Sequence, residues 1–139
     1  MTLTEERKTP AASRAATWAL FAVDAGLMVT SGVIHLHLWD IAYRHVATLG
    51  PLFLVQAIAG LILAVAVLVT RNILVVGAAL ALMAGTIVGF ILVRSVGLFG
   101  FRLTFTSGLA YTVLIVEIVA VAALALTGAL LLRGREQSR

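Results

Sequence analysis

Four long apolar stretches, joined by short links, constrain this chain more than any other feature of its sequence. They run from about Ala15 to Leu38, Pro51 to Val69, Ile73 to Val93 and Gly108 to Leu132. Each has close to the roughly 20 residues that a helix needs to cross the hydrocarbon core of a bilayer. Because lipid offers no partner to a backbone N–H or C=O group, such stretches must be helical. The sequence therefore predicts an all-α fold, an integral membrane four-helix bundle.

The composition excludes a soluble domain. Hydrophobic residues make up 62% of the 139 residues and charged residues 12%, whereas soluble domains are about 45–50% apolar and about 25% charged. A chain of this length cannot bury so much apolar mass in a core of its own. We expect a multi-pass protein of the plasma membrane, with the lipid bilayer as its surroundings.

The basic residues predict the orientation of the bundle. Of the ten Lys and Arg residues, three lie in a polar N-terminal tail (1–14), three in a basic C-terminal tail (133–139), and Arg71 lies in the link between the second and third spans. The other three lie in the two longer links, on the opposite side. The positive-inside rule then places both termini in the cytoplasm.

The third span carries a stripe of small residues. Its members, Gly77, Ala81, Gly85 and Gly89, recur at every fourth position and share one helix face. Small residues let another helix backbone approach closely. One interpretation is packing against a neighbouring helix of the same bundle, and the other is contact with a second copy or a partner subunit.

The residue inventory excludes several kinds of chemistry. The chain has no cysteine, which excludes disulfides, thiolate metal sites and cysteine-ligated iron–sulfur clusters. Its formal charge is +4, but no basic run alternates with aromatic residues, so no nucleic acid partner is predicted. No serine lies in a nucleophile-elbow pattern. The sequence does not indicate an enzyme that acts by itself.

Polar residues within the spans are the candidates for function, because an ionisable group in lipid is costly. Asp24, Met28, Ser31 and His35 share one face of the first span. Asp24 is interpreted either as an acid bonded to a Thr of a neighbouring span, Thr86 or Thr127, or as a proton-coupling group.

An outer polar cluster forms the strongest signal. Its members, His35, Gln56, Arg94 and Glu117, come one from each span and lie near the same membrane face. One interpretation is a structural lock in which Arg94 pairs with Glu117. A second is a pocket for a small amphiphile such as a quinone, whose carbonyl groups would bond to His35 and Glu117.

A metal site is the third interpretation of this region. It would use His35, His37 or His45 with Glu117 or Asp40, and copper or zinc would suit these ligands. His35 and His37 lie about 200° apart around a helix, so both cannot face inward from a regular one. All three histidines lie in or just after the first span, which favours a single-His haem over a bis-histidine haem.

Both longer links carry aromatic residues. The first, with Trp39 and Tyr43, is predicted to form a short interfacial helix. The second, Arg94–Ser107, is rich in Gly and Phe near its start. Its apolar content predicts that it folds back over the mouth of the bundle or that it docks onto a larger complex.

Three runs carry a resemblance to a known group of proteins. They are His35-Leu-His-Leu-Trp39, Gly50-Pro-Leu-Phe-Leu-Val-Gln56 and Gly97-Leu-Phe-Gly-Phe101, followed by Glu117. They resemble small four-span membrane proteins of actinobacteria that carry no assigned activity. The resemblance extends from the first span to the fourth and implies the same fold, but no catalytic role. That group is expected to have an acidic residue where this chain has Arg102.

These observations lead to three hypotheses about function. The first is a small non-catalytic membrane protein that acts as an accessory or stabilising subunit of a larger complex, with other membrane subunits as partners. The second is a redox protein that binds a quinone, copper or haem at the outer polar cluster. The third is a small oligomeric transporter.

Overall fold

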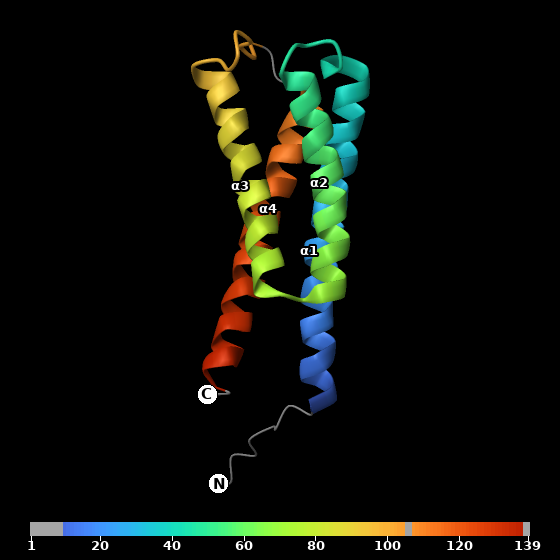
Figure 1. The fold of residues 1–139 in the computed structure, drawn as a ribbon, viewed down its shortest axis with the longest axis vertical. Coiled ribbons are helices and arrows are strands. Elements are labelled where there is room, and N and C mark those ends of the chain that lie inside the picture. The colour runs from blue at the N-terminus through green and yellow to red at the C-terminus, as the bar shows by residue number, and fades with distance from the viewer. Residues whose placement is uncertain (1–9, 105–106, 138–139) are drawn as a thin grey trace.

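The computed structural model describes residues 10–104 and 107–137, which form a bundle of four long helices (Figure 1). The helices are α1 (Pro10–Leu38), α2 (Leu49–Thr70), α3 (Ile73–Ser95) and α4 (Gly108–Glu136), and one π-helical turn, η1 (Trp39–Tyr43), continues α1. All four helices are long and apolar enough to cross a membrane. The predicted all-α fold of four helices is confirmed, and each helix could span a membrane.

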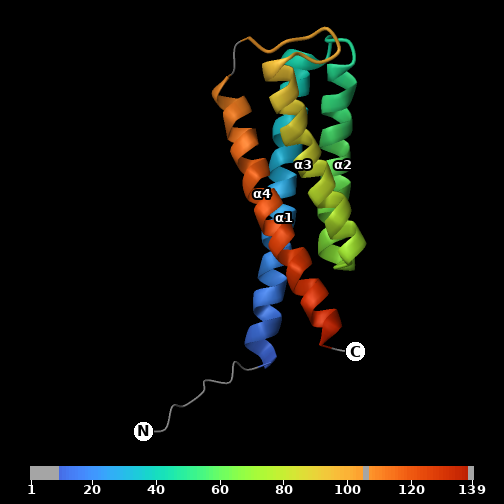
Figure 2. The ribbon, with the colours of Figure 1, turned by 90° about the vertical axis from the view of Figure 1, so that its left-hand side faces the viewer.

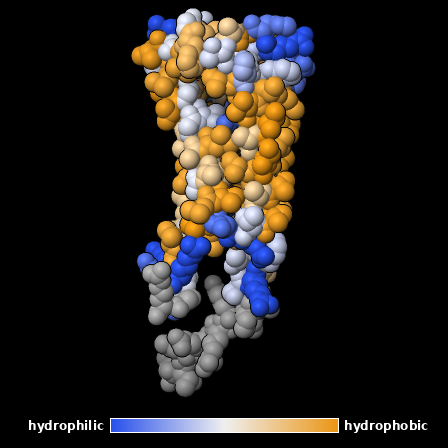
Figure 3. Space-filling view, in the orientation of Figure 1, coloured by the Kyte–Doolittle hydropathy of each residue, from blue (hydrophilic) through white to orange (hydrophobic). Residues whose placement is uncertain are grey.

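The helices run alternately up and down, so α1 begins and α4 ends at the same end of the bundle (Figure 1). We call this the terminal end. The opposite end, with η1 and the link between α3 and α4, is the distal end. Polar residues gather at both ends of the face drawn in Figure 3, and apolar residues cover the middle. This banding fits a molecule whose middle lies in lipid and whose ends lie at the two membrane surfaces.

Two helices are longer than the sequence predicted. Helix α1 begins at Pro10, before the predicted start at Ala15, and proline suits the first turn because its missing N–H has no helical partner there. Helix α4 continues to Glu136, through part of the predicted basic tail 133–139. Cationic side chains in its last turn stabilise that extension by facing the negative end of the helix dipole. Residues 1–9 and 138–139 of the predicted tails lie outside the described residues.

Glycines allow α1 and α2 to pack closely. A Cβ atom added to Gly32 of α1 would lie 3.2 Å from the Ala57 carbonyl oxygen and 3.2 Å from Cγ of Leu61. At Gly60 of α2, an added Cβ would lie 3.8 Å from the carbonyl oxygen of Met28. The first approach is closer than ordinary contact and the second is not, so the interface depends on the absence of a side chain at Gly32.

The small-residue stripe of α3 does not pack within the bundle, so the first interpretation of it is wrong. Gly77, Ala81 and Gly85 are exposed, and a Cβ atom added to Gly77, Gly85 or Gly89 would meet nothing within 4 Å. Helix α3 instead buries another face, with Val76, Ala79 and Met83. The spacing predicted a face that permits close approach, but the bundle supplies no helix to occupy it.

We expect Gly32→Ala to lower the free energy of unfolding by about 1–3 kcal/mol, because its methyl group overpacks the α1–α2 interface. Gly26→Ala on the same helix is the matched control, since a Cβ there meets nothing within 4 Å. The control should not lower the free energy of unfolding and should raise it by up to about 1 kcal/mol, because alanine favours a helix more than glycine does. Equilibrium unfolding in mixed detergent micelles, followed by helical circular dichroism, measures both. Equal effects would contradict the assigned interface.

Candidate functional site

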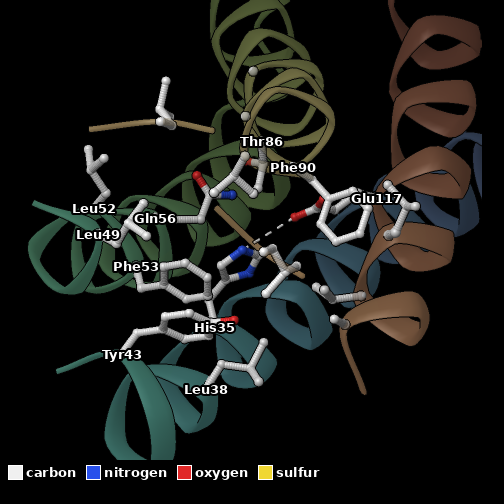
Figure 4. A pocket seen from close by; sticks show the side chains of 18 of the residues that line it. His35, Leu38, Tyr43, Leu49, Leu52, Phe53, Gln56, Thr86, Phe90 and Glu117 are labelled. Atoms are coloured by element: carbon white, nitrogen blue, oxygen red, sulfur yellow. Dashed lines mark ion pairs between the residues drawn. The ribbon is translucent and has the colours of Figure 1, made fainter. Parts of the chain in front are cut away.

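A cavity of about 330 Å³ lies in the distal half of the bundle (Figure 4). Its walls are mainly apolar, and each helix also contributes one polar residue. These are His35 from α1, Gln56 from α2, Thr86 from α3 and Glu117 from α4. We call this space the distal cavity. Three of the four members of the predicted outer polar cluster therefore meet there.

The distal cavity opens sideways, between α2 and α3. Leu52 of α2 and Ala81 and Gly85 of α3 line it, and all three are also exposed at the bundle surface. Figure 3 shows polar residues at the bottom of a hollow between these two helices. The exposed part of the small-residue stripe thus borders an opening at the level of the apolar spans.

Ser31, His35 and Glu117 form a buried polar group at the α1–α4 interface. The Ser31 hydroxyl donates a hydrogen bond to Oε1 of Glu117 over 3.1 Å. Nδ1 of His35 lies 3.0 Å from the Ser31 carbonyl oxygen and 3.4 Å from the Ser31 hydroxyl oxygen. Nε2 of His35 lies 3.7 Å from Oε1 of Glu117, an approach drawn as the dashed line in Figure 4.

This geometry assigns the protons of the pair. The Ser31 carbonyl oxygen can only accept, so Nδ1 of His35 carries a hydrogen and donates to it. Nε2 then faces a Glu117 oxygen, and that approach is attractive only when one proton lies between the two side chains. The pair is therefore either a neutral imidazole with a carboxylic acid or an imidazolium with a carboxylate. Its net charge is zero in both forms, which suits a site buried among apolar helices.

Gln56 supplies a hydrogen-bond donor that has no partner. Its amide nitrogen is buried and forms no hydrogen bond within the described part of the chain. Figure 4 shows the side chains of Gln56, His35 and Glu117 turned toward the same space. A buried donor without a partner is unusual, because it loses its hydrogen bonds to water without replacement. A ligand with an acceptor atom would satisfy it.

Aromatic rings close the distal cavity on the side of η1. The Phe53 ring lies 5.3 Å from the His35 ring, and Tyr43 stacks on Phe53 at 4.3 Å. Phe101 meets the edge of Tyr43 at 6.1 Å. Gly50 allows this arrangement, since a Cβ atom there would lie 2.6 Å from the Tyr43 carbonyl oxygen. The first outer link thus forms a helical turn at the predicted place and supplies a wall of the site.

The second outer link folds back over the bundle, as predicted. Leu98 and Phe101 exchange two backbone hydrogen bonds, of 2.8 and 2.9 Å, around a tight turn. The two residues between them, Phe99 and Gly100, both have positive φ, as a type I′ turn requires. Leu98, Phe101 and Leu103 line the distal cavity, so this turn covers its distal side.

Arg94 does not join the other members of the predicted cluster. It is exposed and does not line the distal cavity. Its Nη1 donates to the Leu103 carbonyl oxygen over 3.3 Å, and Nη2 of Arg102 donates to the Ser95 carbonyl oxygen over 2.8 Å. The predicted Arg94–Glu117 pair is thus replaced by bonds that hold the link. A long cationic side chain reaches the membrane surface at lower cost than it enters the core.

The structure does not bring the three histidines together. His35 is buried and His37 exposed, as their 200° separation predicts. Nε2 of His45 accepts a hydrogen bond of 3.0 Å from Arg44, which also pairs with Asp40 over 3.3 Å. Among the residues described, no group of three or more His, Asp or Glu side chains could hold a metal ion. The predicted metal ligands therefore do not form a site.

Asp24 lies apart from the distal cavity, in the core. It is fully buried, and its Oδ2 accepts a hydrogen bond of 2.6 Å from Thr127 of α4. Of the two predicted partners, Thr127 is the one used, since Thr86 donates to the Leu82 carbonyl oxygen of its own helix.

Sequence reasoning missed the role of Ser31 as a donor to Glu117. Its position four residues before His35, on the same face, was the available signal.

Comparison with protein families, with curated proteins and with solved structures finds no match to this chain. The functional argument therefore depends on the geometry of the site.

We expect Ser31→Ala to lower the free energy of unfolding by about 1–3 kcal/mol, because Glu117 then loses its buried donor. Ser95→Ala is the matched control, since the hydroxyl of the exposed Ser95 donates to the Ile91 carbonyl oxygen of its own helix. The control should cost less than about 0.5 kcal/mol. Unfolding in mixed micelles measures both variants. If Ser31→Ala is as stable as the control, the group of Ser31, His35 and Glu117 does not stabilise the bundle.

Proposed function

We propose that this protein binds a lipid-soluble molecule with a hydrogen-bonding head, of the quinone class, in the distal cavity. The observation that carries the proposal is an apolar cavity, open sideways, in which each helix places one polar residue. Cavities with apolar walls and a few convergent polar groups are the usual form of small-molecule sites. A sideways opening at the level of the spans suits a ligand that arrives from the bilayer.

The size and chemistry of the distal cavity support a flat ring with carbonyl groups. Its volume of about 330 Å³ lies at the lower end of the range for ligand sites, about 300–1,000 Å³. This volume suits a ring-sized head whose apolar tail extends along the opening past Ala81 and Gly85. Phe53 and Phe90 offer aromatic surface to the ring.

The polar groups match the two carbonyl oxygens of a quinone. The unpartnered amide nitrogen of Gln56 can donate to one oxygen. The protonated member of the His35–Glu117 pair can donate to the other oxygen, because the 3.7 Å between Nε2 and Oε1 is too long for a hydrogen bond within the pair. A quinone is favoured over copper or haem because His37 and His45 lie away from the cavity, and Nε2 of His35 faces Glu117.

A second proposal, an accessory or stabilising subunit of a larger membrane complex, is supported by the surface of α3. The part of the stripe at Gly77 is exposed and does not line the distal cavity. Val96 and Phe99, in the link beyond α3, are 73% and 62% exposed. A close-packing face near the start of α3 and exposed apolar side chains beyond its end both suit contact with a neighbouring subunit. The resemblance to small four-span actinobacterial proteins is compatible with both proposals and assigns no activity.

The third hypothesis, an oligomeric transporter, has less support. Met28, Met83 and Leu124 are fully buried and fill the core below the distal cavity. A path through one copy would have to pass these side chains. Transport would therefore require a route between several copies of the chain.

We expect Gly85→Leu to block ligand binding without disturbing the fold. Gly85 lines the distal cavity, and a Cβ atom there meets nothing within 4 Å, so a larger side chain has room to enter the opening. Titration with a short-chain naphthoquinone should give a Kd at least about tenfold higher than for the unaltered protein, a loss of about 1.4 kcal/mol. Quinone carried through purification, measured in an organic extract, should fall in parallel.

Gly77→Leu is the matched control for this experiment. It lies on the same stripe, its Cβ also meets nothing within 4 Å, and it does not line the distal cavity. It should bind the naphthoquinone like the unaltered protein. If neither the unaltered protein nor the control binds a quinone, or if both variants bind equally well, the proposed function is wrong.

We also propose that both termini face the cytoplasm, so that the distal cavity lies in the outer leaflet. The absence of cysteine from the sequence allows a direct test. With a membrane-impermeant maleimide on intact cells, Ala47→Cys should be labelled and Gln137→Cys should not. Both residues are exposed; Ala47 lies in the link between η1 and α2, at the distal end, and Gln137 follows α4, at the terminal end. The reverse labelling pattern would contradict the proposed orientation.

A further inference from the structure

A second cavity, of about 710 Å³, lies at the terminal end of the bundle. Helices α1 and α4 extend beyond the link between α2 and α3, as Figures 1 and 2 show. The cavity lies between these two extensions and beside that link. Its lining includes Leu20 of α1, Leu130 and Leu131 of α4, and two arginines, Arg71 of the link and Arg135 of α4. We call it the terminal cavity.

Arg71 is held in place at the terminal cavity. Its backbone is left-handed, with φ of 49°, and its N–H donates to the Val67 carbonyl oxygen over 3.1 Å, which caps α2. Its guanidinium carbon lies 4.3 Å from the centre of the Trp18 ring. A guanidinium over an indole ring is attracted to its electron-rich face. Backbone and ring together keep this charge beside the cavity.

The arginines of the terminal cavity have no acidic partner in the described part of the chain. Neither Arg71 nor Arg135 forms an ion pair with an acidic side chain there. The ion pairs of the described residues are His35–Glu117 and Arg44–Asp40. The hydroxyl protons of Thr17 and Thr127 are already donated, to the Ser13 carbonyl oxygen and to Asp24. The guanidinium groups are therefore the donors that the cavity offers to a ligand.

We propose that the terminal cavity binds the phosphate group of an anionic phospholipid. Guanidinium groups are suited to phosphate, because their planar N–H donors match its oxygen atoms. The leucines that line the same cavity offer an apolar surface to the acyl chains. A lipid phosphate satisfies both parts, whereas a soluble phosphate ion satisfies only the arginines. Basic pockets between membrane helices are typical sites for anionic headgroups. The inference does not depend on the distal cavity or its ligand.

Native mass spectrometry of the full chain, purified in mild detergent with equal amounts of phosphatidylglycerol and phosphatidylcholine, tests this proposal. The protein should retain phosphatidylglycerol in preference. Arg135→Gln should reduce the retained phosphatidylglycerol about fivefold, since one basic residue near the membrane surface contributes about 1 kcal/mol. Arg71→Gln should reduce it similarly.

Arg133→Gln is the matched control. Arg133 lies on α4, two residues before Arg135, and its exposed side chain does not line the terminal cavity. The substitution therefore removes the same charge outside the proposed site. It should reduce the retained lipid less than about twofold. Circular dichroism should show equal helicity for all variants. Equal retention of the two lipids, or an equal loss in Arg133→Gln, would overturn the proposal. Displacement of the lipid by an excess of inorganic phosphate would instead indicate a site for a soluble anion, and would overturn it as well.

Discussion

Lipid supplies no hydrogen-bond partner, so the acidic side chains buried within the spans bond to partners in the bundle, and the packing of the helices depends on these bonds. The partners are found between α1 and α4. Asp24 accepts from Thr127, and the Ser31 hydroxyl donates to Glu117 beside His35. These contacts lie at two heights along a pair of antiparallel helices. Any slide or rotation of one helix would break both contacts, so together they select one register.

The remaining helices dock onto this pair in ways that leave the distal cavity. Helix α2 packs on α1 through Gly32, where the backbones nearly touch. Helix α3 follows after a link of two residues and packs on α4 with its Met83 face. The face of α3 that carries Gly85 remains without a helical neighbour. A cavity with polar groups at its base is thus the space left when three helices pack tightly and the fourth packs only on one side.

Hydropathy was sufficient to predict the four spans, because each stretch reaches the length that lipid demands. Comparing depth in the membrane also brought together His35, Gln56 and Glu117 correctly. It failed for Arg94, since depth places a backbone but does not say where a long side chain ends. The interpretation that the stripe around Gly85 packs against a helix of the same bundle was wrong for a related reason. Small residues show that a face permits close approach, but they do not show that a neighbour is present. The donor Ser31 was missed because a hydroxyl in a helix usually bonds to its own backbone.

The two cavities lie at opposite ends of the bundle, and the core between them is closed. Met28, Met83 and Leu124 are fully buried there, and the unbranched methionine side chain fills irregular gaps well. A conduit would need polar groups along its length, whereas the polar side chains are concentrated at the α1–α4 contacts. Each cavity therefore has its own lining, the distal one beside an opening among the spans and the terminal one beside basic side chains. This separation favours a protein that holds molecules of the membrane over one that moves solutes across it.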